Sequence, residues 1–179
     1  MMVSKDVGDS NLIVPLEVYR TSRMLIEEAV NDVHFLGTEA TLETVLELLQ
    51  HCLFLGMGKV MVADMAKHEL RLMSGYDLPE DKKQITYAFD EGLIGRAFSS
   101  GRVLTVFDLI QQTEYKGKFN RVDELPYIRP GFTAMPIKGV NGEVLGVLAV
   151  NHGGRSDIER AELVAVLHKT AKLLAPLLH

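Results

Sequence analysis

The chain has 179 residues, a formal charge of −5 and 47% hydrophobic residues, the composition of one ordinary globular domain. Its acidic balance excludes the concentrated positive charge on which nucleic-acid binding depends. No apolar run reaches the roughly 18 residues of a membrane span. The single cysteine, Cys52, cannot form an internal disulfide and fits a reducing compartment, so we expect a cytoplasmic protein. We divide the chain into a flexible N-terminus, 1–14, and a single domain, 15–178.

Helical periodicity dominates the first third of the chain. Apolar residues at spacings of three, four and seven predict a helix over 15–36. One stripe of this helix holds Val18, Ser22, Leu25, Ala29 and Leu36. A second helix is predicted over 38–55, and its apolar face consists of Leu42, Val45, Leu46, Leu49 and Leu53.

The middle of the chain has the pattern of strands. Short apolar or alternating segments predict strands over 59–65, 69–74, 84–89 and 102–107, with a short helix over 93–100. The polar and aromatic stretch 108–131 is too long for a simple connection, which indicates a functional or mobile loop.

A hairpin and a helix complete the predicted elements. Asn141-Gly142 lies between two strand-like segments, 132–138 and 143–150, and predicts a type I′ turn. Ser156 and Glu159 have the spacing of a capping box at the start of a helix over 157–178. Apolar residues surround much of this helix, so more than one surface must cover it. One would be the sheet, and the other the first helix, a partner chain, or both.

Three segments carry a resemblance to a known family. They are 90–101 (DEGLIGRAFSSG), 105–108 (TVFD), and the pair 134–138 (AMPIK) with 142–148 (GEVLGVL). With the order of elements, they resemble the GAF family of small-molecule sensor domains over roughly 15–178. Within that family the chain is most similar to the N-terminal sensors of enhancer-binding transcription activators of the nitrogen-fixation-regulator type. The resemblance implies an α+β fold with a central antiparallel, PAS-like sheet of about six strands. The N- and C-terminal helices would cover one face, and short helices with a long loop the other.

The resemblance also implies a ligand on one face of the sheet, beneath 91–101 and 109–131. The candidate ligand-binding residues are Phe89, Arg96, Phe98, Phe107, Tyr115, Tyr127, Arg129, Phe132 and Met135. Ligand pockets are typically apolar with a few polar anchors. A guanidinium would hold a carboxylate or phosphate in a bidentate fork, so an anionic ligand is one expectation. Core packing for the aromatic residues and a solvated loop for the arginines are the alternatives.

Catalytic and metal-binding motifs are absent from the sequence. One cysteine cannot perform the thiol chemistry of GAF-type methionine sulfoxide reductases. Asn151-His152 departs from the pattern of cyclic-nucleotide-binding members. The six histidines show no metal-ligand spacing, although spacing alone leaves a metal or haem open, and the cofactor stays unknown. We predict a regulatory domain that is not an enzyme; a ligand-free domain that only dimerises and a GAF-fold enzyme are the alternatives.

We also predict a homodimer, with no contact of this domain to nucleic acid or membrane. The prediction rests on the apolar surroundings of the last helix and the stripe of the first. The interface residues would be Val18, Leu25, Ala29, Leu163, Val166, Leu167 and Leu174. Ligand would order the 109–131 loop, and the change would pass to the first and last helices.

Overall fold

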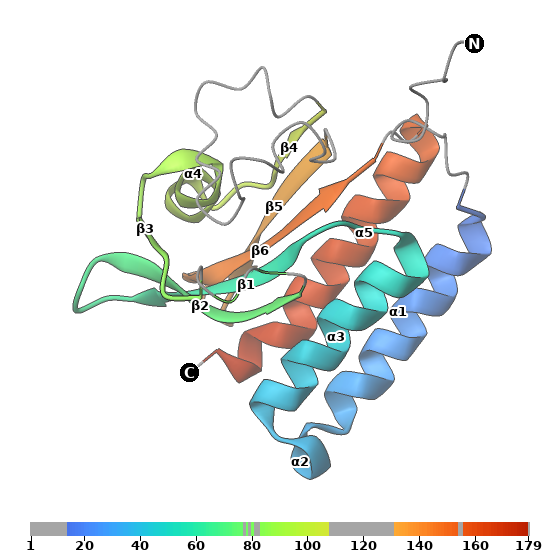
Figure 1. The fold of residues 1–179 in the computed structure, drawn as a ribbon, viewed down its shortest axis with the longest axis horizontal. Coiled ribbons are helices and arrows are strands. Elements are labelled where there is room, and N and C mark those ends of the chain that lie inside the picture. The colour runs from blue at the N-terminus through green and yellow to red at the C-terminus, as the bar shows by residue number, and fades with distance from the viewer. Residues whose placement is uncertain are drawn as a thin grey trace.

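The computed structural model describes residues 14–76, 78, 80, 83–107, 131–153 and 156–178, except for the side chains of 34 and 35. A six-stranded sheet in the order β3-β2-β1-β6-β5-β4 forms its centre, and every neighbouring pair is antiparallel (Figure 1). The strands are β1 Gly58–Asp64, β2 Glu69–Tyr76, β3 Thr86–Ala88, β4 Leu104–Val106, β5 Gly131–Lys138 and β6 Val144–His152. The predicted α+β class with about six antiparallel strands is therefore confirmed.

One face of the sheet is covered by the N- and C-terminal helices (Figure 1). They are α1 Leu16–Asn31, α2 Val33–Leu36, α3 Thr38–Leu53 and α5 Asp157–Leu174, which a 3₁₀ turn, Ala175–Leu177, extends. α3 packs on β1 and β2, α5 packs on β5 and β6, and α1 lies over α3 and α5. α4, Gly92–Ser100, covers the opposite face. The sheet therefore separates two apolar cores, one on its helix side and one on its α4 side.

The first predicted helix is divided into two. α1 ends at Asn31, and α2 begins two residues later. The buried stripe of α1 consists of Tyr19, Ser22, Ile26, Ala29 and Val30. Leu25 and Leu36, which the prediction placed on this stripe, are exposed. The predicted stripe is rotated from the real one because α1 faces a groove between two helices, and the sequence does not show the direction of that groove.

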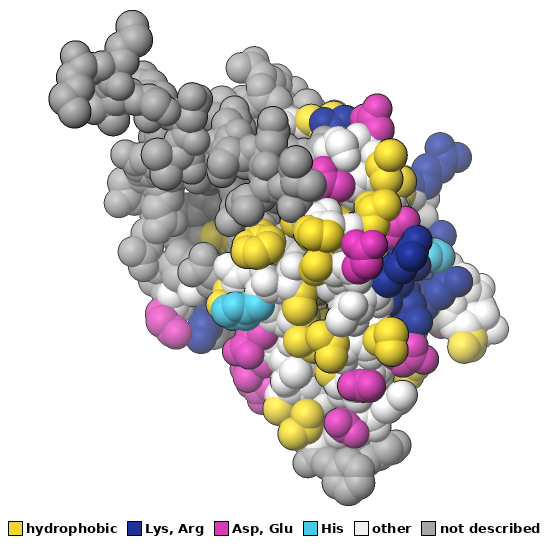
Figure 2. Space-filling model, turned by 90° about the vertical axis from the view of Figure 1, so that its right-hand side faces the viewer, with side chains coloured by type: hydrophobic (Ala, Val, Ile, Leu, Met, Phe, Trp, Pro, Cys, Tyr) yellow, Lys and Arg dark blue, Asp and Glu magenta, His cyan; other side chains and the backbone are white. Residues whose placement is uncertain are grey.

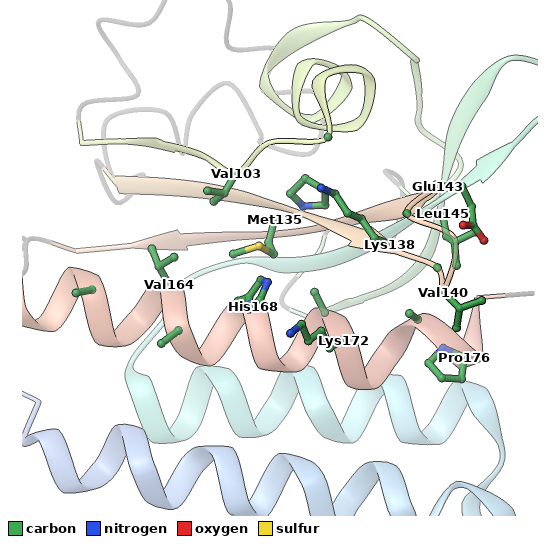
Figure 3. A pocket seen from close by; sticks show the side chains of 18 residues that line it. Val103, Met135, Lys138, Val140, Glu143, Leu145, Val164, His168, Lys172 and Pro176 are labelled. Carbon is green, nitrogen blue, oxygen red and sulfur yellow. The ribbon is translucent and has the colours of Figure 1, made fainter.

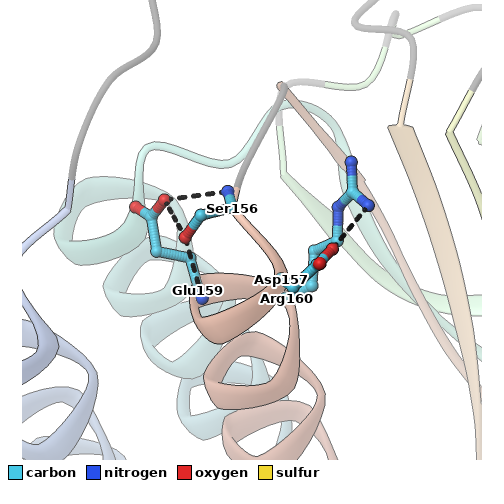
Figure 4. Close-up of polar contacts among 4 residues, drawn as sticks. All are labelled: Ser156, Asp157, Glu159 and Arg160. Carbon is cyan, nitrogen blue, oxygen red and sulfur yellow. Dashed lines mark hydrogen bonds and ion pairs between the residues drawn. The ribbon is translucent and has the colours of Figure 1, made fainter.

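The beginning of α5 follows the prediction closely. The Glu159 N–H donates to Ser156 Oγ at 3.3 Å, and the Ser156 N–H donates to the Glu159 carboxylate at 3.0 Å (Figure 4). The same buried carboxylate accepts the Val14 N–H at 2.9 Å. Val14 is itself buried and lies one residue before the predicted domain boundary at 15. Glu159 thus joins the start of α5 to the segment that leads into α1.

The hairpin between β5 and β6 is antiparallel as predicted, but its turn is wider than type I′. The Gly142 N–H donates to the Gly139 carbonyl at 3.0 Å, and the Gly139 N–H donates to the Glu143 carbonyl at 2.8 Å. Gly142 has φ +82°, whereas Asn141 is not among the described non-glycine residues with positive φ. The prediction of a two-residue type I′ turn, which needs positive φ at both positions, is wrong.

Candidate functional site

The α4 side of the sheet has an apolar floor and an apolar cover. Adjacent strands supply the buried floor residues Met61, Phe132, Ala134, Val147 and Ala149. The buried α4 residues Leu93, Ile94 and Ala97 pack in the same cluster. This is the face to which the family resemblance assigns a ligand.

Three glycines determine how α4 lies over the sheet. Gly92 and Gly101, at the two ends of α4, both have φ +65°, a conformation that L side chains rarely adopt. Gly95 lies so close to the end of β3 that an added Cβ would be 2.8 Å from the Ala88 carbonyl oxygen. Gly92 and Gly101 therefore allow α4 to begin and end where it does, and Gly95 allows α4 to lie close to the end of β3.

A charged side chain of β1 lies on this apolar floor. Lys59 alternates with Met61 along the strand and is only 3% exposed. Its Nζ lies 5.9 Å from the centroid of the Phe132 ring. Burial lowers the pKa of the Lys59 ammonium from 10.5 to about 8, because desolvation disfavours the charged form. An anion beside Lys59 would interact with it more strongly than in bulk water.

Asn151 of β6 adds a buried polar side chain to the same floor. Its main chain is paired, since its N–H donates to the Met57 carbonyl at 3.0 Å and its carbonyl accepts the Gly56 N–H at 2.8 Å. Its side-chain Nδ2 is buried and has no hydrogen-bond partner among the described residues. The register places Asn151 opposite Phe132 and two residues from Ala149, the partner of Lys59. Lys59 and Asn151 are therefore near neighbours on the α4 side of the sheet. Lys59 supplies a cation there, and Asn151 supplies an amide donor.

Four of the predicted ligand residues lie on or beside α4 and its floor. Phe132 is a floor residue with 1% exposure. The Phe89 and Phe98 rings contact each other, with centroids 4.6 Å apart, and both pack against the α4-side core. Arg96 is exposed on α4. Tyr115, Tyr127 and Arg129 lie outside the described residues and stay predictions.

Two predicted ligand residues belong to the opposite face. Met135 packs in the helix-side core, and the Phe107 ring lies 3.9 Å from the Arg160 guanidinium of α5. Alternation explains both, because Ala134 and Val106 face α4 and their successors must face the helices. The prediction that Met135 and Phe107 lie beneath α4 is wrong.

A family model described as the GAF domain matches residues 36–179 of this chain. The chain belongs to the GAF family. It is 27% identical over 147 residues to the Nif-specific regulatory protein of Klebsiella pneumoniae, which confirms the predicted likeness to nitrogen-fixation regulators. That alignment covers 78% of this chain but 27% of the relative, so the chain spans about a quarter of that protein's length.

Solved structures of other proteins share the fold. The GAF domain of A. aeolicus nlh2 in an inactive state has a TM-score of 0.76 at 20% identity, covering 91% of this chain and 97% of that one. The free methionine-R-sulfoxide reductase of Neisseria meningitidis, in complex with its substrate, has a TM-score of 0.73 at 18% identity, covering 91% and 89%. The same fold therefore occurs in the nlh2 GAF domain and in an enzyme.

The predicted dimer residues of this GAF domain fall into two groups. Four residues of α5 are 0–1% exposed in the protomer's own core: Leu163, Val166, Leu167 and Leu174. They present no surface to a partner, because α1 and the sheet cover the side of α5 on which they lie. Ala29 is 9% exposed, Val18 is half-buried and Leu25 is 36% exposed, so only α1 offers part of the predicted surface.

Cys52 is remote from the α4 side of this GAF domain. It lies on α3, half-buried against the helix-side core, with the sheet between it and Lys59. Within the described ranges, no three His, Cys, Asp or Glu side chains gather as metal ligands. No helix in the described part of the chain is long and apolar enough to cross a membrane.

Sequence reasoning did not nominate Lys59 or assign Asn151 a place in the site. A signal for Lys59 was available, since a lysine inside the apolar run GKVMV must either reach an edge or be buried. Only the sheet order shows that β1 lies at the centre, where a side chain has no edge to reach.

Proposed function

We propose that this GAF domain is the ligand-binding sensor of a regulatory protein, and that its ligand is a small organic anion. The buried Lys59 ammonium carries the proposal, because an anionic group beside it would interact with it more strongly than in bulk water. Asn151 supplies a hydrogen-bond donor to the same ligand. A ligand with a carboxylate or phosphate group and a small apolar part fits both features.

The rest of the proposal extends this site. The domain over 15–178 would act as one cytoplasmic unit, with the 109–131 segment as the lid. Arg129, which precedes Pro130 and β5, would add a guanidinium from that lid.

A path from the site to the helices supports a regulatory role. Asn151 faces the ligand side of β6, and the next residue, His152, faces the helices. His152 Nε2 lies 3.0 Å from Thr133 Oγ1, which lies 3.1 Å from Thr105 Oγ1. The chain then enters α5 through the capping box, where Glu159 holds Val14. A ligand that moves the end of β6 would therefore act on the starts of both α5 and α1.

The enzyme alternative finds less support. A sulfoxide reductase needs thiols at the site, and the one cysteine lies across the sheet from Lys59. A ligand-free domain that only dimerises would not account for the buried Asn151 Nδ2, which has no hydrogen-bond partner among the described residues.

Titration calorimetry with small dicarboxylates and organic phosphates tests the ligand proposal. We expect at least one of them to bind, and Lys59→Met to weaken it by about tenfold or more, the loss of one buried charge-assisted contact. Lys67→Met, in the exposed β1–β2 turn, is the matched control and should bind as the parent does. Equal affinity in the parent and Lys59→Met would refute the role of Lys59. Native mass spectrometry of the purified chain would report a co-purified ligand.

We also propose that the domain forms a homodimer through the outer face of α1. Met24 is 64% exposed and Leu25 36% exposed. Figure 2 shows hydrophobic side chains in a broken band on this side of the molecule, with acidic side chains among them. The ion pairs Arg23–Glu162 and Glu27–Lys169 join α1 to α5. A movement of α5 would therefore be transmitted through α1 to a partner bound there.

Light scattering with Leu25→Glu tests the dimer. The parent should dimerise at micromolar concentration, and a carboxylate in the apolar band should raise the dimer Kd by about tenfold or more. Met65→Glu places the same charge on another exposed methionine, in the β1–β2 turn, and should leave the dimer intact. A monomeric parent would overturn this part.

A further inference from the structure

A cavity lies on the helix side of the sheet, away from Lys59. It occupies about 890 Å³ between α5, the edge of β5 and the β5–β6 turn (Figure 3). Met135 of β5, Val164 and Ala165 of α5 and Pro176 of the 3₁₀ turn contribute its apolar lining. Its size falls within the range of small-molecule sites.

The cavity exists because the last strand of the sheet is short. β4 pairs only with residues 132–134, so β5 extends beyond it from Met135 to Lys138 with no outer neighbour among the described strands. Small side chains on the facing side of α5, at Ala161, Val164 and Ala165, leave room beside that edge.

Basic side chains predominate around this groove. Lys138 comes from β5, and His168 and Lys172 from α5 (Figure 3). The lining carboxylate, Glu143, already accepts the Asn141 N–H at 3.0 Å in the turn. Neither Lys138 nor Lys172 forms an ion pair within the described part of the chain, in contrast to Lys169, which pairs with Glu27. The ammonium groups of Lys138 and Lys172 lie beside an apolar surface, and this arrangement complements a molecule with an anionic group and an apolar body.

The edge of β5 is poorly suited to the addition of a peptide strand. Pro136 lacks the N–H that a new strand would pair with, and Lys138 places a charge at the end of the edge. Both are devices by which sheet edges avoid pairing with another chain. A small amphipathic molecule is therefore a better occupant than an extended peptide.

We propose that this groove is a second ligand site, for an amphipathic organic anion such as a medium-chain carboxylate. The apolar chain would lie along Met135 and Val164, and the carboxylate would contact Lys138 and Lys172. Because α5 forms one wall, occupancy would act directly on the helix layer. The site is independent of the α4-side ligand.

Titration calorimetry with octanoate, compared with octanol, tests the second site. We expect saturable octanoate binding, about tenfold weaker binding of the uncharged octanol, and a similar loss in the double variant Lys138→Glu/Lys172→Glu. Lys67→Glu, which changes charge at a distant turn, should bind normally, and so should Lys59→Met. Val164→Phe should weaken octanoate by filling the groove.

Amide chemical shifts locate the bound molecule. Octanoate should move the resonances of Met135, Val164 and His168 more than those of the α4-side floor. The inference is overturned if octanoate fails to saturate at about millimolar concentration, if octanol binds as well, or if Lys59→Met abolishes binding. Circular dichroism of each variant would verify that the fold is retained.

Discussion

The destabilising effect of Lys59 should disappear as the pH rises from about 7 to about 10.5. In the folded chain the pKa of Lys59 is about 8, whereas the unfolded chain has the ordinary value of 10.5. Between these values the unfolded state binds more protons, so stability rises with pH. The full pKa difference corresponds to about 3 kcal/mol.

Urea unfolding of the parent and Lys59→Met at several pH values from 7 to about 10.5 measures this effect. Other groups titrate over the same range, so the quantity of interest is the difference between the two proteins. We expect the parent to gain about 3 kcal/mol relative to Lys59→Met. A pH-independent difference would show that Lys59 keeps an ordinary pKa. Binding of an anionic ligand should change in the opposite direction and weaken above about pH 8, where the ammonium loses its proton.

Replacing Glu159 with alanine should destabilise the domain by about 2–4 kcal/mol. Its buried carboxylate accepts the Val14 N–H at 2.9 Å, the Ser156 N–H at 3.0 Å and the Ser156 hydroxyl at 2.9 Å. Alanine removes the acceptor of all three and leaves the Val14 N–H buried without this partner. The loss would release the segment before α1 from α5. A movement at the end of β6 should then have less effect on the start of α1.

Asp157→Ala is the matched control for Glu159→Ala. Asp157 is also an acidic residue of the first turn of α5, but it is exposed and pairs only with Arg160 at 3.3 Å among the described residues. An exposed ion pair contributes little to stability. Thermal unfolding should therefore separate the two variants clearly, and equal losses would show that Glu159 acts only through the helix dipole. Glu159→Gln, which keeps an oxygen acceptor, should fall between the two.

Local patterns predicted the elements well where neighbouring residues alone decide them. The capping box of Ser156 and Glu159 depends on a spacing of three residues, and the structure contains it. The apolar face of α3 follows directly from helical periodicity, and all five predicted residues are buried. The short helix predicted over 93–100 corresponds to α4, Gly92–Ser100.

The candidate site was predicted less completely, because its residues depend on which face of a strand they occupy. Phe132 and Met135 are three residues apart on β5, so alternation must put them on opposite faces. We predicted both of them beneath α4. Only the packing of α4 and α5 on the sheet shows that Phe132 lies beneath α4 and Met135 on the helix side.

By itself, the sequence determined the order of the elements, since this follows from periodicity and turn residues. Its motifs also carried the resemblance to the GAF family, which implies the α+β class. The tertiary structure alone decided the environment of each polar or apolar group. Lys59 is buried because β1 lies at the centre of the sheet. The four α5 residues predicted to form a dimer interface are covered by α1 and the sheet of the same chain, so their apolar character does not require a partner chain. Burial is a property of what packs against a residue, and those neighbours come from distant parts of the chain.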